Sequence, residues 1–249
     1  MIALPPRSPP SPTRRSSDLV KEHTRNGGLA FVLDGDSLLR VDGDSIEEIC
    51  KSAEIPIALD GVASHNIANA LAAAALTHCL GIPMSDIHEG LTSMSQDNNP
   101  GRSNVYSISD FKVLVDFAHN PHAMKALFNM AHALPAKRRL LAFAQAGDRT
   151  DESIRELARS AWSIGLDKVV VSELEAYARG RSRGEVFGII RDELINCGAR
   201  KDQIQHFMEE TESLDAALDW AQPGDLIIML ALSDREAIQD KLKSLSSPH

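Results

Sequence analysis

The chain has 249 residues, of which 43% are hydrophobic, so it can bury an ordinary core in one large or two modest domains. Its 35 acidic residues outnumber its 26 basic ones and give a net charge of -9, which argues against a nucleic-acid partner but allows a small anionic ligand held by a few local donors. No apolar run approaches the roughly 20 residues that cross a bilayer, and the three cysteines have no paired spacing, so we expect a cytoplasmic protein without membrane, disulfide or zinc roles.

Residues 1–19 are rich in proline, serine and arginine and too poor in apolar residues for an amphipathic element, which predicts disorder. No apolar stretch follows the basic residues, so a secretory signal is not indicated. The segment 12–19 resembles the translation of a sequencing adapter. We therefore expect that residues 1–19 are not native and that the true protein enters near Val20; a genomic reading frame that starts at Met1 would contradict this.

Residues 20–99 have the pattern of a small α/β unit. Apolar runs at 29–33 and 37–41 flank an Asp-Gly turn, which is typical of a β-hairpin. A second turn at 42–44 leads to a short segment at 46–50, an extended stretch at 55–59, an alanine-rich helix at 64–76 and another helix at 83–94. The first helix has Ser64 or Asn66 as its N-cap and Gly81 as its stop. The polar stretch 95–100 marks a domain boundary.

From Gly101 onward, strands alternate with helices of about ten to fifteen residues, which predicts βαβ units and a mostly parallel sheet flanked by helices, a Rossmann-like α/β domain. The predicted strands are 104–107, 112–116, 139–144, 168–172, 203–207 and 226–230. The predicted helices are 121–134, 151–164, 184–197, 213–221 and 234–245.

Two short motifs stand close together, Pro100-Gly101-Arg102 and Asp116-Phe117-Ala118-His119-Asn120-Pro121. The second follows a predicted strand, so its polar side chains should lie at the carboxyl edge of the sheet, where α/β folds bind ligands. Asp116, His119 and His122 could be metal ligands, but Pro121 prevents one helix from holding both histidines, and no metal site is expected. Asp116 and Asn120 could instead cap the next helix.

Three further polar segments each allow two interpretations. Gly147-Asp148-Arg149 follows the next strand and could bind an anion, or simply begin a capped helix. Asn66 and Asn69 could read an adenine edge, or cap the alanine-rich helix. Arg179-Gly180-Arg181 could contact a ligand, or be a solvated loop.

In their order along the chain, these motifs resemble the closing part of the Mur ligase family, and within it the Mur-ligase-like module of cyanophycin synthetases. The resemblance spans about residues 28–245. Further segments that carry it are the run 147–152, Arg179-Gly180-Arg181 with Gly184-Glu185, and Ala216-Ala217-Leu218 leading to Pro223-Gly224-Asp225-Leu226. Family members use ATP to phosphorylate a carboxylate, and an amine then attacks the acyl phosphate to form an amide.

The resemblance implies a role for each motif. Asn66 and Asn69 would contact adenine, Asp116 the ribose, and Arg102 the phosphates. The side chains that would line the cleft between two domains are His119, Asn120 and Arg149, with His119 and Arg149 closest to the chemistry. Arg179 and Arg181 would hold the incoming amino acid or peptide, and if it is arginine, Glu173 or Glu175 could pair with its guanidinium.

One departure from the family is the lack of a Gly-x-x-x-x-Gly-Lys-Thr loop. We therefore expect residues 20–99 to be the α/β tail of an incomplete P-loop ATPase domain and residues 100–249 to be the C-terminal lid domain. ATP and Mg²⁺ would be the cofactors, with the Mg²⁺ ligands mostly upstream. The chain alone should lack ligase activity, and the complete enzyme could be a homo-oligomer.

The Arg-Gly-Arg segment favours a ligase that adds arginine to an aspartate side-chain carboxylate, because muropeptide ligases typically have an Asp-Asn-Pro-type segment at that point. A peptidoglycan-precursor ligase or a folylpolyglutamate synthetase is the alternative within the family. Outside it, the alternative is a Rossmann-like nucleotide-binding module without chemistry.

Overall fold

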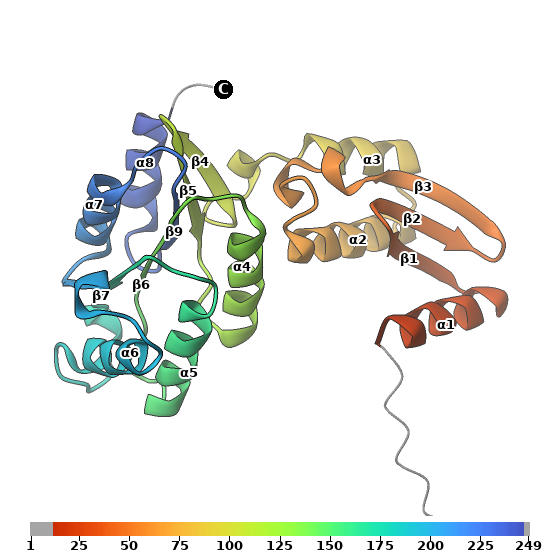
Figure 1. Cartoon of the computed structure of the whole chain (residues 1–249). Helices are drawn as coiled ribbons and strands as arrows, with labels where there is room; N and C mark the ends of the chain where they lie inside the picture. The colour runs from red at the N-terminus through yellow and green to blue at the C-terminus, as the bar shows by residue number, and fades with distance from the viewer. Residues whose placement is uncertain (1–11, 247–249) are drawn as a thin grey trace, which may run out of the picture. The chain divides into compact units, whose positions relative to one another are not determined.

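The computed structural model describes residues 12–246, with side chains from Asp18 onward except that of Pro121. The described chain divides into two compact units (Figure 1). The first ends at Met94 and the second starts at Ser95, apart from residues 62–64, which group with the second. The division thus coincides with the start of the polar stretch 95–100. That the first unit is the tail of an ATPase domain stays a prediction.

The first unit begins with a helix where disorder was expected. Helix α1 spans Pro12–Arg25, so the prediction was wrong for residues 12–19, while residues 1–11 lie outside the described part of the chain. The helix is anchored at its C-terminal end, where Thr24 is buried and a ring nitrogen of His23 lies 3.2 Å from the Leu29 carbonyl oxygen. Once this last turn is fixed, each further residue toward the N-terminus adds a helical hydrogen bond at little cost. Pro12, at the first helical position, sacrifices no hydrogen bond there.

A three-stranded antiparallel sheet follows, in the order β1-β2-β3. Its strands are Leu29–Asp34, Ser37–Asp42 and Ser45–Lys51, so the predicted hairpin is confirmed and the short segment after it is a full third strand. The predicted extended stretch 55–59 is wrong. Two 3₁₀ turns, Ser52–Glu54 and Pro56–Ala58, occupy this region, because Ile55 and Ala58 are buried and the amide of Ala58 donates to the Ile55 carbonyl.

Helices α2 (Ser64–Cys79) and α3 (Met84–Ser93) complete the first unit. Their apolar faces share one core with the sheet. The buried members are Leu38, Ile49, Cys50, Ile55, Ala58, Ile67, Ala70, Ala74, Ile87 and Leu91. Burial raises the pKa of the Cys50 thiol to about 11, so this cysteine is protonated at neutral pH.

The second unit is built on a six-stranded sheet in the order β4-β5-β9-β6-β7-β8. All neighbouring strands are parallel except β4, which pairs antiparallel with β5. The strands are Asn104–Ile108, Phe111–Asp116, Arg139–Phe143, Lys168–Ser172, Ile204–Phe207 and Leu226–Leu230 for β4 to β9. The predicted mostly parallel sheet is thereby confirmed, with strand ends within a residue of those expected.

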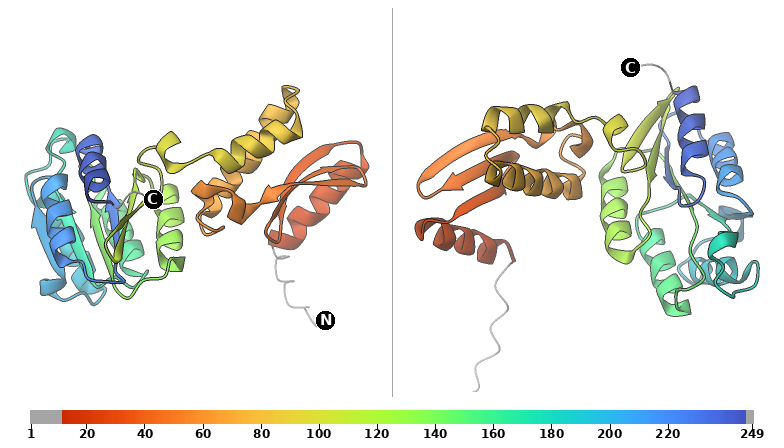
Figure 2. Two further views of the ribbon diagram at one scale, coloured as in Figure 1. Left: turned by 90° about the horizontal axis from the view of Figure 1, so that it is seen from above. Right: turned by 180° about the vertical axis from the view of Figure 1, so that it is seen from behind.

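Five helices cover the two faces of this sheet: α4 (Pro121–Ala133), α5 (Asp151–Trp162), α6 (Glu185–Asn196), α7 (Glu210–Trp220) and α8 (Arg235–Leu245). The chain steps in one direction from β5 to β8, and right-handed crossovers therefore put α4, α5 and α6 on one face. It then returns to place β9 between β5 and β6, so α7 and α8 lie on the other face (Figures 1 and 2). This return brings the carboxyl ends of β5, β9, β6 and β7 side by side.

Alternating strand residues fill the two cores. Val113, Val115, Ile227 and Met229 face α7 and α8, where they meet Leu214 and other apolar side chains of those helices. Their neighbours in sequence are equally buried on the opposite face, which gives the continuous apolar runs typical of a sheet covered on both sides.

Candidate active site

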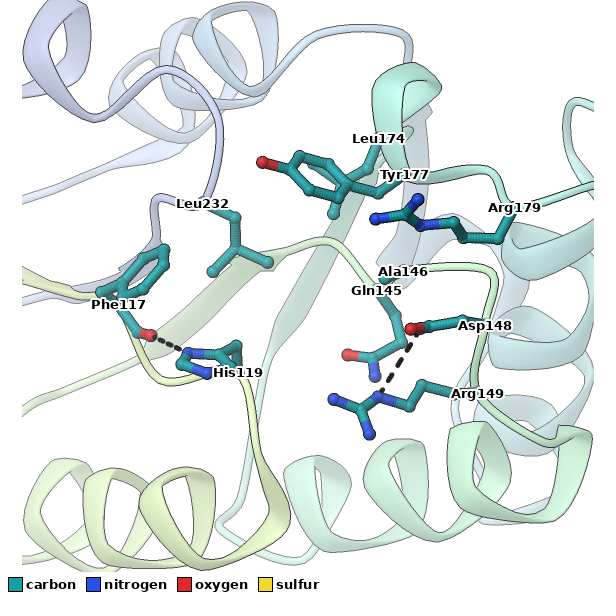
Figure 3. Close-up of a pocket in the computed structure, with 10 residues that line it drawn as sticks. All are labelled: Phe117, His119, Gln145, Ala146, Asp148, Arg149, Leu174, Tyr177, Arg179 and Leu232. Carbon is teal, nitrogen blue, oxygen red and sulfur yellow. Dashed lines mark hydrogen bonds and ion pairs between the residues drawn. The ribbon is translucent and has the colours of Figure 1, made fainter.

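A cavity of about 270 Å³ opens at the carboxyl edge of the second unit's sheet (Figure 3). It is lined by the segments that directly follow four neighbouring strands: Phe117 after β5, Gln145 after β6, Leu174 after β7 and Leu232 after β9. The remaining lining residues are His119, Ala146, Asp148, Arg149, Tyr177 and Arg179. The cavity therefore combines apolar walls with two guanidinium groups, a carboxylate, an imidazole and an amide.

The two motifs that flank β4 and β5 are joined directly. The backbone N–H of Ser103 donates to Oδ2 of Asp116 at 2.8 Å, and its hydroxyl lies 3.1 Å from the same oxygen. On the other side of Arg102, Gly101 has a φ of +76°, which favours glycine, and its N–H donates to Asn104 Oδ1. Buried Asp116 and Asn104 thus hold the backbone on both sides of Arg102.

Arg102 itself is exposed, with its guanidinium carbon 5.3 Å from the centroid of the Phe117 ring. A second guanidinium, that of Arg235, lies 4.2 Å from the same centroid. The motif analysis did not identify Arg235. Its position at the start of the helix that follows the last strand, at the same edge of the sheet, is the pattern that could have found it.

His119 lines the cavity. Its Nδ1 lies 3.0 Å from the Phe117 carbonyl oxygen (Figure 3). Asn120 is the N-cap of α4, where its Oδ1 accepts from the N–H of Ala123 at 2.9 Å. The capping interpretation therefore holds for Asn120, and Pro121 stands at the first helical position, where a missing N–H costs nothing.

Arg149 is exposed and lines both this cavity and an adjoining one of about 190 Å³ beside α4 and α5. Its Nε lies 3.8 Å from Asp148 Oδ1, a loose ion pair (Figure 3). Thr150 caps α5 by accepting from the Ser153 N–H. Position 147 requires glycine, because the backbone of Ala178 passes so close that a Cβ there would lie 2.0 Å from its carbonyl oxygen.

The two arginines of the Arg179-Gly180-Arg181 segment differ in their surroundings. Arg179 lines the cavity with its guanidinium carbon 5.8 Å from the Tyr177 ring centroid. Arg181 is 16% exposed, and all three of its nitrogens bind protein acceptors. These acceptors are the carbonyl oxygens of Gly147 and Arg149 and the carboxylates of Asp151 and Glu185, at 2.7 to 2.9 Å. Arg181 therefore joins its own loop to the loop that carries Arg149.

Glu175 is 84% exposed and forms an ion pair with Arg183 at 3.3 Å. Glu173 is less exposed, and its Oε1 lies 2.7 Å from His206 Nε2 and accepts from the Gly184 N–H at 3.1 Å. Both glutamates line a further cavity of about 140 Å³ beside the first one. Glu175 is thus the more available of the two for an external cation.

The predicted adenine contacts belong to the first unit. Asn66 is 4% exposed, and its Nδ2 donates to the Ile57 carbonyl at 2.7 Å. Asn69 is exposed on α2. Helix α2 begins at Ser64, so Asn66 lies inside it and is not its N-cap.

Among the residues whose side chains are described, no group of three or more histidine, cysteine, aspartate or glutamate side chains could hold a metal ion. No helix in the described part of the chain is long and apolar enough to cross a membrane.

The family model described as "Mur ligase, glutamate ligase domain" matches residues 101–231. Cyanophycin synthetase of Trichormus variabilis is 31% identical over 227 residues, which are 90% of this chain and 25% of that protein. The UDP-N-acetylmuramoyl-L-alanyl-D-glutamate–2,6-diaminopimelate ligase of Alkaliphilus metalliredigens is 29% identical over 191 residues, 75% of this chain and 36% of that protein. The chain thus spans about a quarter of the length of the cyanophycin synthetases it matches.

Solved structures share the fold. The structure of E. coli FolC in complex with ADP superposes with a TM-score of 0.63 at 20% identity, over 87% of this chain and 46% of that chain. A UDP-N-acetylmuramate-alanine ligase from Thermotoga maritima superposes with a TM-score of 0.52 at 19% identity, over 72% of this chain and 37% of that chain.

Proposed function

Because the chain belongs to the Mur ligase family, a family of ATP-dependent ligases, we propose that it forms part of an enzyme that joins a carboxylate to an amine through an acyl phosphate. The similarity to cyanophycin synthetases favours arginine as the amine and an aspartate side chain as the carboxylate. The chain would supply the side chains that meet the phosphoryl group and the amine.

The single observation that carries this proposal is the cavity at the carboxyl edge of the sheet. His119, Arg149 and Arg179 come from three separate motifs and line one cavity. A ligase of this type needs positive charge for a transferring phosphoryl group and an acceptor for the proton that the amine releases. The guanidinium group of Arg149 and the imidazole of His119 meet these two needs.

Each side chain has a distinct role in this proposal. ATP supplies the phosphoryl group that activates the carboxylate. Arg149 neutralises its charge, since a guanidinium group binds phosphoryl oxygens through paired N–H donors. The hydrogen bond of His119 to the Phe117 carbonyl requires Nδ1 to donate, so the neutral ring presents Nε2 as an acceptor for the proton of the attacking amine.

The residues expected to hold the nucleotide fit it to different degrees. Arg102 is exposed and has no carboxylate partner within the described part of the chain, which suits a phosphate ligand. Asp116 uses Oδ2 on Ser103 and would accept a ribose hydroxyl through Oδ1. Asn69 fits an adenine contact better than Asn66, whose amide nitrogen is already bonded. Asn120 would donate to the nucleotide through its Nδ2 group. We assign no Mg²⁺ ligand to this chain.

For the amino acid, we propose direct contacts from Arg179 to its carboxylate and from Glu175 to a guanidinium side chain. Arg181, whose nitrogens are all engaged, would act by holding the loop of Arg149. Glu175→Gln in the complete gene product should raise the apparent KM for arginine, because it removes the paired negative charge. An unchanged KM would exclude Glu175 from the substrate site.

The proposal is tested by amide formation in the complete gene product, with ATP, Mg²⁺ and an aspartate polymer as carboxylate donor. Arginine, diaminopimelate, D-alanyl-D-alanine and glutamate are compared as amines, and release of phosphate that depends on arginine is expected. Arg149→Ala should lower kcat by about 10²-fold, the usual effect of losing one charge-stabilising group. The matched control is Arg200→Ala, because Arg200 is exposed and its one ion pair among the described residues is with Asp202. Amide formation with none of these amines, or equal rates for both variants, would reject the proposal.

The 249-residue chain by itself is expected to form no amide, because it contains no Gly-x-x-x-x-Gly-Lys-Thr loop to hold the ATP phosphates. The same assay on the purified chain checks this, and any arginine-dependent amide product would contradict it.

A further inference from the structure

Three arginines of the second unit differ from the others there in having no acceptor. Most of that unit's arginines pair with a carboxylate or, like Arg139, donate to carbonyl oxygens. Within the described part of the chain, Arg102, Arg179 and Arg235 have neither kind of partner and contact only aromatic rings. All three follow or precede strands at the same edge of the sheet, in a protein of net charge -9.

Two of the three share one aromatic ring. The guanidinium carbons of Arg102 and Arg235 lie 5.3 and 4.2 Å from the centroid of Phe117. The ring attracts each cation through its face and leaves the in-plane N–H donors unused. Two like charges near one ring repel each other, and among the described side chains no carboxylate lies within ion-pair distance to offset this. An anionic ligand would remove the repulsion.

A buried polar group holds the backbone that carries each arginine. Asp116 accepts from Ser103, the residue after Arg102. Glu210 is 1% exposed, and its two carboxylate oxygens accept from the N–H groups of Leu232, Ser233 and Asp234 at 2.8 to 3.0 Å. These three residues directly precede Arg235. The two guanidinium groups are therefore presented from fixed loops, which lowers the entropy lost when they bind a ligand.

We infer that Arg235 and Arg102, over the ring of Phe117, form a binding site for a polyphosphate chain, with Arg235 as a phosphate ligand that the family motifs do not identify. A di- or triphosphate suits the pair because it offers adjacent charged groups to two forked donors, whereas a single carboxylate satisfies only one fork. That the polyphosphate belongs to a nucleotide rests on the proposed function. The inference of an anion site depends only on the positions of Arg102 and Arg235.

The probe is inorganic tripolyphosphate, titrated into the full 249-residue chain by calorimetry at low and at physiological salt. Saturable binding that weakens with salt is expected, because exposed charges are screened. Arg235→Ala and Arg102→Ala should each weaken binding about tenfold, equal to about 1.4 kcal/mol. Arg235→Lys should restore part of the affinity, since it keeps the charge without the fork. Both arginines are exposed, so neither change should unfold the chain.

The control is again Arg200→Ala, which should bind within about twofold of the wild type, as expected of a surface change outside the site. No saturable binding by the wild type, or equal affinity of Arg235→Ala and Arg200→Ala, would overturn the inference.

Amide formation by the complete gene product separates this inference from the proposed function. If Arg235→Ala raises the apparent KM for ATP while Arg200→Ala does not, the inference is supported. If amide forms and Arg235→Ala leaves that KM unchanged, the inference fails and the function stands. If tripolyphosphate binding depends on Arg235 but no amine is joined, the function fails and the anion site stands.

Discussion

At the scale of single residues, neighbouring side chains of one type have different tasks. Arg179 and Arg181 stand two positions apart, but the first lines the cavity and the second has every nitrogen bonded to protein. Asp116 could be assigned to a ligand or to a cap from sequence, and the structure adds a contact that neither assignment includes, because its Oδ2 accepts from the Ser103 backbone. Residue type and spacing identify such positions as chemically important, but they do not say which acceptor each donor meets.

Glu210 is the residue with the clearest pH dependence. Burial raises the pKa of its carboxyl, and hydrogen bonds from Asp234, Leu232 and Ser233 only partly counter this. Between its ordinary pKa of 4.5 and the raised folded value, the folded state therefore binds more protons than the unfolded state, and stability falls as the pH rises through that window.

Glu210→Gln should remove this contribution, because the amide does not ionise while its oxygen can still accept from the loop. The variant's free energy of unfolding, relative to the wild type, should rise between pH 4.5 and pH 7, as measured by urea denaturation at both. Glu210→Ala, which leaves buried N–H groups unpaired, should cost about 1–3 kcal/mol at either pH. If Glu210→Gln and the wild type differed in free energy of unfolding by the same amount at both pH values, a raised pKa of Glu210 would be contradicted.

At the scale of elements, the strands and helices of the second unit lie close to where the hydrophobic pattern predicts them. Strands β7 (Lys168–Ser172) and β9 (Leu226–Leu230) match the expected bounds, because their apolar runs are buried on both faces and each strand begins directly after an aspartate. The loops between elements were not predictable in the same way. Arg181 joins the loop after β7 to the loop after β6, two segments that only the sheet brings together.

Arg181→Ala should loosen this connection between loops and displace Arg149. In the complete gene product we expect kcat to fall by about 10- to 100-fold, the effect of a small misplacement of a catalytic group, with little change in the KM for ATP. Arg181→Lys should recover little of the loss, since an ammonium group cannot reach four acceptors in two loops. A change confined to the KM for the amine, with kcat preserved, would instead indicate that Arg181 contacts the substrate directly.

At the scale of the whole molecule, each compact unit has its own hydrophobic core. Leu38 is fully buried in the core of the first unit, and Leu141 is fully buried within the sheet of the second. A unit with its own core can unfold locally without exposing the other core. The two units should therefore respond separately to core mutations.

Leu38→Ala should lower the stability of the first unit by about 2–5 kcal/mol, the usual cost of emptying a buried leucine site. Hydrogen exchange followed by mass spectrometry should show faster exchange in β1 to α3 and unchanged exchange in β5, β6 and β9. Leu141→Ala is the reciprocal control and should show the reverse. Faster exchange in both units from either variant would mean that they unfold together.

Local sequence patterns were enough to predict the α/β class of the second unit, the bounds of its strands to within a residue and the motifs that meet at the carboxyl edge of its sheet. Those features follow from local patterns, because burial imposes a period on apolar residues and strand ends expose the residues that follow. The strand order, which inserts β9 between β5 and β6 and brings Arg235 to Phe117, is visible only in the folded chain. The folded chain also shows that the side chains of Glu210 and Arg181 hold loops through hydrogen bonds to the backbone. Contacts between segments distant in the chain depend on how the sheet is assembled, and no local pattern encodes them.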